Sequence, residues 1–169
     1  ILRCLVGSEM CIRDRSRQLT KEFGQFKGGH GIGSSLVNVP KGLVLLVDHA
    51  GPSYLLYINR KDGKTVWRKP RDSRVSWTTP LYINYSNEEQ IVISSNGLVD
   101  CYRLKDGERV WWFDDIQRNT VASPSTNGKL IVVGSSYPKQ SLAISLGGKG
   151  NINETHLKWR ADSVTCSFA

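Results

Sequence analysis

The sequence predicts an all-β fold, a partial β-propeller of four-stranded antiparallel blades. Three observations predict it: a pattern that recurs every 44 residues, hydrophobic alternation of the strand type within each copy, and no segment with the apolar period of a helix. The chain has 169 residues, 39% of them hydrophobic, which suits one globular domain.

A tryptophan motif and a proline step return with the same period. The segment 61–67, KDGKTVW, recurs 44 residues later as KDGERVW, and the Thr-Thr-Pro step at 78–80 recurs as Ala-Ser-Pro. The residues shared by the two copies are Gly63, Trp67 and Pro80 in one and Gly107, Trp111 and Pro124 in the other. Because a residue that returns once per unit usually serves the unit, we interpret these positions as structural and the tryptophans as packing between blades.

The third copy departs from the period. Its tryptophan, Trp159, lies 48 residues after Trp111. The polar, glycine-rich stretch 147–154 holds the additional residues and is predicted to be an enlarged hairpin loop. The repeats are therefore predicted to span approximately 34–77, 78–121 and 122–165, and the chain from 16 to 169 is predicted to form about three and a half blades.

Each copy divides into four short strands. In the second copy, the apolar or alternating runs are 81–83, 90–93, 98–102 and 110–113. Asn96 and Gly97 separate the second run from the third, and both residues accept the positive φ of a type I′ turn. A sheet of this size cannot bury both faces by itself, whereas sheets stacked around an axis can, which favours a propeller. The landmarks of WD and kelch repeats are not in place.

The first fifteen residues do not fit the repeat. Residues 1–15, ILRCLVGSEMCIRDR, resemble the translation of a sequencing-adaptor read-through, a contaminant of metagenomic reads, and we predict that they are not native. They lack the uninterrupted apolar core of a signal peptide. The alternative is a genuine linker or strand. If they are foreign, we expect the native N-terminus to be missing.

Composition argues against several classes of protein. The longest apolar run, 42–47, is far shorter than the roughly 20 residues of a membrane-spanning helix, so no membrane span is predicted. The formal charge of +8 could favour nucleic acid, but the basic residues are scattered, and we interpret the densest group, 68–71, as solvated surface and expect no nucleic-acid partner. The cysteines match no zinc or redox spacing, and Cys101 is predicted to be a buried free thiol.

The tryptophan motif resembles the repeat of the pyrroloquinoline-quinone-like (PQQ-like) propeller family, small–x–Asp–x–x–Thr–Gly–x–x–x–Trp. Segments 57–67 and 101–111 keep its glycine and its tryptophan but not its aspartate or its threonine. The resemblance implies that each tryptophan docks on the neighbouring blade. It also implies that the parent ring has seven or eight blades, of which this chain is a fragment.

Other stretches are similar to one branch of this family, the secreted bacterial propellers related to the outer-membrane-protein assembly lipoprotein BamB. They are 30–35, 47–49, 75–80 and 142–150. This resemblance implies a non-catalytic binding or scaffold module, periplasmic or extracellular, that presents loops or a funnel to a protein or envelope partner. It implies that the module binds no cofactor and that it needs the remaining blades of the parent propeller as partners.

An enzyme is the alternative that the same family leaves open. Quinoprotein dehydrogenases of this fold hold PQQ and calcium in the funnel, often beside a disulfide between adjacent cysteines, which this chain lacks. No Ser-His-Asp arrangement stands out. The glycine-rich run at 28–33 opens a strand rather than a helix, so it lacks the helix N-terminus that binds phosphate. No catalytic, cofactor-binding or metal-binding residue is predicted.

Four residues are interaction candidates: His30, Asp48, His49 and Trp77. The positions 44 residues to either side of Trp77 hold Gly and Val, so Trp77 does not repeat, and it could either pack or take part in recognition near the funnel. His30 precedes the first strand of its blade, and Asp48 and His49 follow the second. We place them at opposite ends of the sheet, which favours solvated loop residues over a metal site.

A fragment of a ring should expose the apolar faces of its two end blades. In a closed ring each face would be covered by a neighbour. We therefore expect the chain to aggregate or oligomerise when it is expressed alone.

Overall fold

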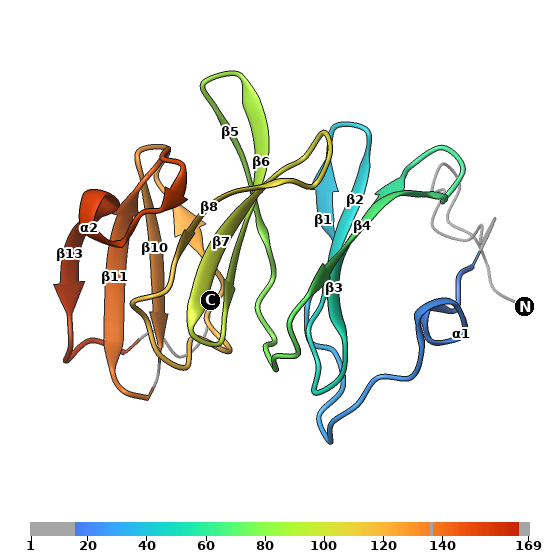
Figure 1. The fold of residues 1–169 in the computed structure, drawn as a ribbon, viewed down its shortest axis with the longest axis horizontal. Coiled ribbons are helices and arrows are strands. Elements are labelled where there is room, and N and C mark those ends of the chain that lie inside the picture. The colour runs from blue at the N-terminus through green and yellow to red at the C-terminus, as the bar shows by residue number, and fades with distance from the viewer. Residues whose placement is uncertain (1–15, 136, 166–169) are drawn as a thin grey trace, which may run out of the picture.

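Three antiparallel sheets stand side by side in the computed structural model, which describes residues 16–135 and 137–165 (Figure 1). The first sheet contains β1 (Val37–Val39), β2 (Gly42–Val47), β3 (Ser53–Asn59) and β4 (Thr65–Arg71). The second contains β5 (Leu81–Tyr85), β6 (Glu88–Ser95), β7 (Leu98–Arg103) and β8 (Arg109–Phe113). The third contains β9 (Ser125–Thr126), β10 (Leu130–Ser135), β11 (Gln140–Ser145) and β13 (Leu157–Ala161). We call these sheets the first, second and third blades.

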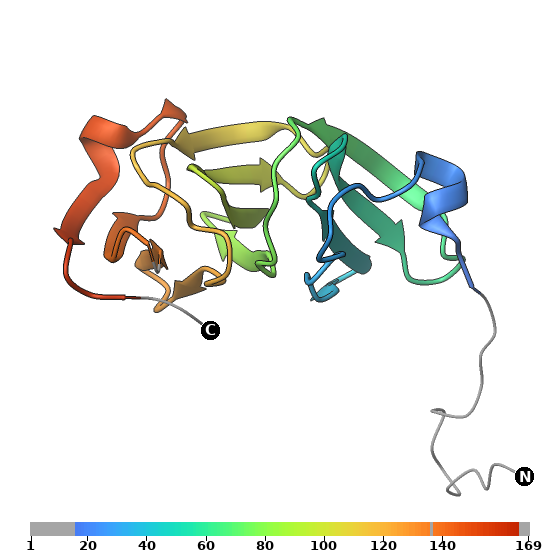
Figure 2. The same cartoon turned by 90° about the horizontal axis from the view of Figure 1, so that it is seen from below.

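The blades follow one another face to face, as Figure 2 shows from below. In the first two blades the strands pair in chain order as a meander, and the third blade has the same order from β9 to β13. The chain is therefore a partial β-propeller, and the predicted fold class is confirmed. The predicted turn between β6 and β7 has positive φ at both Asn96 (30°) and Gly97 (89°).

A β-bulge precedes the tryptophan in every blade. In each blade one residue of the third strand pairs with the tryptophan of the outer strand, and the residue after it pairs with the residue two positions before that tryptophan. The residues that pair with the tryptophans are Tyr57, Cys101 and Ala143. The skipped residues are Val66, Val110 and Lys158. A bulge strengthens the local twist, so the same kink is built into each outer strand.

Apolar side chains fill both junctions between blades. The first junction is formed by Val39, Val44, Leu46, Leu55 and Tyr57 of the first blade and Ile91, Ile93, Tyr102 and Leu104 of the second. The second junction is formed by Val92, Val99, Cys101, Trp111 and Phe113 of the second blade and Ile131, Val133, Leu142 and Ile144 of the third. Both faces of the second blade are thus buried, as stacking of thin sheets requires.

The outward face of the first blade is covered, contrary to the expectation that both end faces are exposed. Helix α1 (Leu19–Phe23) and the chain that follows it run along this face and pack Leu19, Phe23, Phe26 and Ile32 against Val47, Tyr54 and Leu56. Arg68 adds a cation–π contact on each side, 4.8 Å from the ring centroid of Phe23 and 4.6 Å from that of Tyr54. Residues 19–32 therefore occupy the side on which another blade would pack.

The 44-residue period between Trp67 and Trp111 conceals two compensating changes. In the first blade, Val37 pairs with Val44. The equivalent of Val37 in the second blade is Leu81, 44 residues later, but Leu81 pairs with Val92, which lies 48 residues after Val44. The β5–β6 hairpin is therefore longer than the β1–β2 hairpin. The turn between β6 and β7 is shorter than the turn between β2 and β3 by the same amount, so the overall spacing is unchanged.

The predicted enlarged loop of the third blade lies between β11 and β13. It contains a two-residue strand, β12 (Gly150–Asn151), and a short helix, α2 (Asn153–His156). Strand β12 pairs in parallel with β8, so the loop adds a fifth strand to the outer edge of the second blade. Ile152 is 1% exposed in the second junction and donates its backbone N–H to Trp112 O at 3.0 Å. The loop thus covers the edge of another blade.

The two short helices, α1 and α2, were not indicated by the apolar period of the sequence. Both are of five residues or fewer and have no buried residue within them, so they leave no periodic apolar stripe. Neither has the length or the hydropathy to cross a bilayer.

We predict that Trp111 and Trp159 differ sharply in their contribution to stability. Trp111 is 0% exposed and Trp159 is 44% exposed. Trp111→Ala should lower the free energy of unfolding by about 3–5 kcal/mol, because it leaves a cavity. Trp159→Ala should lower it by less than about 1 kcal/mol. Urea denaturation followed by fluorescence measures both, and equal losses would contradict the burial of Trp111 in the second junction.

We also predict that Cys101 is unreactive in the native protein. Burial raises the pKa of its thiol well above the ordinary value, and the carboxylates of Asp100 and Glu88 raise it further. In a variant with the other three cysteines replaced by serine, a thiol reagent at pH 8 should modify Cys101 only after denaturant is added. Rapid modification without denaturant would show that β7 is accessible.

Candidate functional site

The repeated tryptophan of the first blade contacts the second blade directly. Trp67 is partly buried and donates its indole N–H to Leu104 O at 2.8 Å. Gly107 lies beneath the ring, since a Cβ atom there would be 3.0 Å from Cδ2 of Trp67. Gly63 and Gly107 both have left-handed φ, 70° and 69°, in the equivalent turns of their blades. Gly107 therefore serves its own turn and also the tryptophan of the preceding blade.

The next two tryptophans differ from Trp67 because the repeat changes around them. Trp111 is buried in the second junction, but its indole N–H has no hydrogen-bond partner within the part of the chain that the structure describes. Leu146 takes the place of Leu104 there, and the chain then diverges into the enlarged loop at Gly147. Trp159 is half-exposed, and it occupies the position equivalent to Trp67 on the outward face of the third blade.

A chain of amide-to-hydroxyl hydrogen bonds links the starts of the inner strands. The N–H of Ser35 donates to Thr79 Oγ1 at 3.1 Å, and the N–H of Thr79 donates to Ser123 Oγ at 2.9 Å. Each bond joins residues 44 positions apart. Thr79 and Ser123 directly precede Pro80 and Pro124, which are both buried, and Ser35 precedes the equivalent position in the first blade. The small-small-Pro step therefore places a hydroxyl where it can bind the previous blade.

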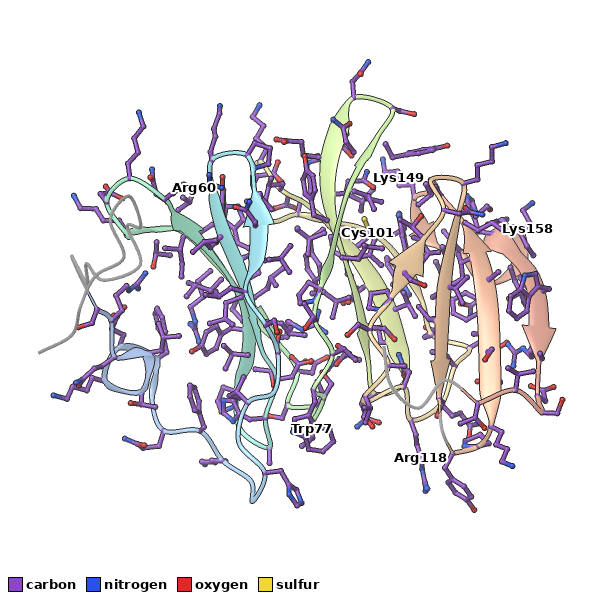
Figure 3. All side chains as sticks on the ribbon, turned by 180° about the vertical axis from the view of Figure 1, so that it is seen from behind. Arg60, Trp77, Cys101, Arg118, Lys149 and Lys158 are labelled. Carbon is purple, nitrogen blue, oxygen red and sulfur yellow. The ribbon has the colours of Figure 1, made fainter. Side chains whose placement is uncertain are left out.

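His30, His49 and Trp77 lie together, so the placement of His30 and His49 at opposite ends of the sheet is wrong. The start of one antiparallel strand and the end of its neighbour lie at the same end of a sheet, which is the physical reason. Together with Lys27 and Val75, these side chains line a cavity of about 60 Å³. The rings of His30 and Trp77 meet edge to face, with centroids 5.9 Å apart. Figure 3 shows Trp77 at the opposite end of the molecule from Arg60.

Trp77 packs on its own counterpart in the preceding blade. A Cβ atom at Gly33 would lie 2.7 Å from Cδ1 of Trp77, so only glycine permits this contact. The backbone N–H of Trp77 donates to Thr120 O at 2.7 Å. His49 is 5% exposed, and its Nδ1 accepts the backbone N–H of Lys27 at 3.2 Å and of Gly51 at 2.9 Å. His49 therefore fastens the N-terminal segment to the first blade.

Asp48 is part of a buried ionic network and is not a solvated loop residue as interpreted from the sequence. Its Oδ1 accepts the Nε–H of Arg71 at 3.3 Å, and its Oδ2 accepts the hydroxyls of Ser76 and Ser95. Arg71 also donates from Nη1 to both carboxylate oxygens of Asp100 at 3.0 Å and to Tyr102 Oη at 2.8 Å. Asp48 directly follows β2, and its bond to Ser95 of the second blade places it in the junction, where it is buried.

This network stabilises the positively charged form of Arg71. Burial alone would lower the pKa of its guanidinium, but Asp100, Tyr102 and Asp48 outweigh burial and raise it above its ordinary value. Burial, followed by the charge of Asp100, raises the pKa of the Tyr102 hydroxyl. The basic group 68–71 is therefore not solvated surface throughout, since the Arg71 side chain is 2% exposed. A carboxylate in the middle of an alternating strand, Asp100, was the signal in the sequence that could have indicated a buried ion pair.

None of the described His, Cys, Asp and Glu side chains gather in a group of three or more that could hold a metal ion. The polar cluster around Arg71 contains a guanidinium and two carboxylates that are already paired with each other. Such a cluster can orient two blades, and its free energy depends on keeping every charge paired.

Two departures from the repeat meet at one end of the molecule. The longer β5–β6 hairpin rises above its neighbours in Figure 1, and the enlarged loop reaches toward it from the third blade. A Cβ atom at Gly147 would lie 3.1 Å from Cε1 of Tyr85, so the loop packs against the hairpin near its tip. In Figure 3, Lys149 of this loop lies at the same end as Arg60 and opposite Trp77. Insertions into single repeats commonly form the binding face of repeat proteins.

Comparison with solved structures finds a likeness to BamB. The crystal structure of BamB from Moraxella catarrhalis is similar to this chain with a TM-score of 0.48 and 11% sequence identity, over 76% of this chain and 48% of BamB. The chain thus spans about half the length of the structure that it matches. No family model and no curated protein matches the chain.

We predict that removing Arg71 destabilises the junction between the first two blades. Arg71→Ala leaves Asp48 and Asp100 buried without their partner and should lower the free energy of unfolding by about 3–5 kcal/mol. Adding Asp100→Asn should recover part of that loss, because it removes one of the unpaired charges. The exposed Lys64→Ala is the control and should change stability by less than about 0.5 kcal/mol. A loss at Arg71 no larger than at Lys64 would show that the network is not formed.

Proposed function

We propose that the chain is a non-catalytic interaction module of the PQQ-like propeller family, in the branch similar to BamB, and that it binds a protein partner in the bacterial periplasm or outside the cell. The observation that carries this proposal is the surface formed where the β5–β6 hairpin meets the enlarged loop. Neither element is needed to repeat the blade. Their lengths are therefore free to serve recognition.

The repeat motif supports the choice of family. Trp67 of the motif at 57–67 contacts Gly107 of the motif at 101–111 and donates to Leu104 O, and this contact between blades supports the assignment to the family. The half-exposed Trp159 occupies the same position on the third blade, and we propose that another blade of the parent propeller covers it. No cofactor is proposed.

Site-specific photo-crosslinking tests the interaction. A photoreactive residue at Asn87, at the tip of the β5–β6 hairpin, should form an adduct with a protein when the full chain is present in the bacterial periplasm. The matched control is Lys139, an exposed residue in the turn between β10 and β11 at the other end of the blades. Adducts that form equally from both positions, or from neither, would argue against a specific binding end.

Titration with PQQ and calcium tests the alternative, a fragment of a quinoprotein dehydrogenase. We expect no change in the quinone absorbance and no dye-linked oxidation of alcohols or sugars. Saturable quinone binding together with oxidation would replace the proposed function with the enzymatic one.

A further inference from the structure

A groove of about 800 Å³ separates the first blade from the β5–β6 hairpin, at the end of the molecule where the insertions meet. It is lined by Lys41 of the β1–β2 turn, by residues of β3 and β4, by the end of β7 and the β7–β8 turn, and by the hairpin tip. This volume falls within the range of about 300–1,000 Å³ that is typical of ligand sites.

The groove exists because the second blade departs from the repeat. Strands β5 and β6 remain paired to Tyr85 and Glu88, and Ser86 and Asn87 turn the chain with positive φ of 52° and 61°. The corresponding hairpin of the first blade ends its pairing at Val39 and Gly42. The longer hairpin therefore forms a wall above the first blade, and contact of Tyr85 with Gly147 supports the wall from behind.

The groove contains apolar surface and an unused hydrogen-bonding group. Val66 is 48% exposed because it is the bulged residue of β4, and the neighbouring Leu104 and Tyr57 are buried. Tyr57 lines the groove, and its hydroxyl has no hydrogen-bond partner within the described residues, although Tyr57 as a whole is only 7% exposed. A tyrosine hydroxyl carries its proton at neutral pH and can donate it in a hydrogen bond, and burial, followed by the charge of Glu89, raises the pKa of Tyr57 further.

The charge that remains at the groove is positive on balance. Glu88 is paired with Arg103 at 2.8 Å and accepts from Gln90 at 2.7 Å, and the hydroxyl of Tyr82 donates to Glu89 at 2.8 Å, but this neutral donor leaves the negative charge of Glu89 in place. Lys41 and Lys105 are exposed on the groove and form no ion pair in the described part of the chain. A ligand that supplies carboxylates would complement these two ammonium groups.

We propose that this groove binds an extended acidic segment of a partner protein, with an apolar side chain against Val66 and carboxylates beside Lys41 and Lys105. This inference rests on the proposed function, since it names the partner chemistry of a protein-binding module. A peptide suits the groove because it supplies apolar and acidic side chains at regular intervals, along with backbone carbonyls that can accept from Tyr57.

Fluorescence anisotropy with three labelled synthetic peptides tests the proposal on the full chain. One peptide combines leucine, serine and glutamate, the second replaces every glutamate with glutamine, and the third replaces every glutamate with lysine. We expect the acidic peptide to bind, its affinity to fall with added salt, and the other two to bind at least about tenfold more weakly. A single-stranded DNA oligonucleotide should not compete.

Two sets of variants locate the binding. The double variant Lys41→Glu with Lys105→Glu should weaken binding of the acidic peptide by about tenfold or more, and Val66→Ser by a smaller factor. Lys139→Glu, at the opposite end, should change it by less than about twofold. Thermal melting of each variant confirms that it is folded.

The outcomes separate the groove from the proposed function. No preference for the acidic peptide, equal weakening by the double variant and by Lys139→Glu, or displacement of the peptide by DNA would each overturn the groove proposal. If Asn87 still crosslinks to a protein in any of these cases, the interaction module stands and only its groove is wrong. If no protein is crosslinked, the proposed function itself fails.

Discussion

Burial of both faces of a thin sheet is the constraint on which this structure depends. The second blade meets it with Ile91 and Ile93 against the first blade and Val92 and Cys101 against the third, all 0% exposed. Strand alternation sends successive side chains to opposite faces, so β5, β6 and β7 each serve two junctions at once. The indole of Trp67, the glycine beneath it and the hydroxyls beside the prolines all act at these junctions rather than within a blade.

The end blades meet the same constraint in different ways. Residues 19–32 place aromatic and aliphatic side chains over the outward face of the first blade, although nothing in their sequence follows the repeat. On the third blade the equivalent face holds smaller residues and the half-exposed Trp159. Charged contacts reinforce the first junction, where Arg71 pairs with a carboxylate from each blade. Apolar burial therefore holds the blades together, and the ion pairs set their orientation.

The sequence predicted the repeating features well and the non-repeating ones poorly. Period, turns and tryptophan positions follow from local residue chemistry, so the strands and the Asn96-Gly97 turn were predictable. Asp48 was misinterpreted because its burial depends on Arg71 and Asp100, which are distant in sequence and lie in two blades. The longer β5–β6 hairpin was hidden because a shorter turn at Asn96 restores the 44-residue spacing. Contacts between residues distant in sequence, and changes of length that cancel each other, do not alter a periodic sequence pattern.

Hydrogen exchange of the indole N–H groups, followed by NMR on the ¹⁵N-labelled chain, tests the stacking of blades most directly. Trp67 donates its indole N–H to the next blade and Trp111 is fully buried, whereas Trp159 is half-exposed. We expect slow exchange for Trp67 and Trp111 and rapid exchange for Trp159. Rapid exchange at all three indoles would contradict face-to-face packing of the blades.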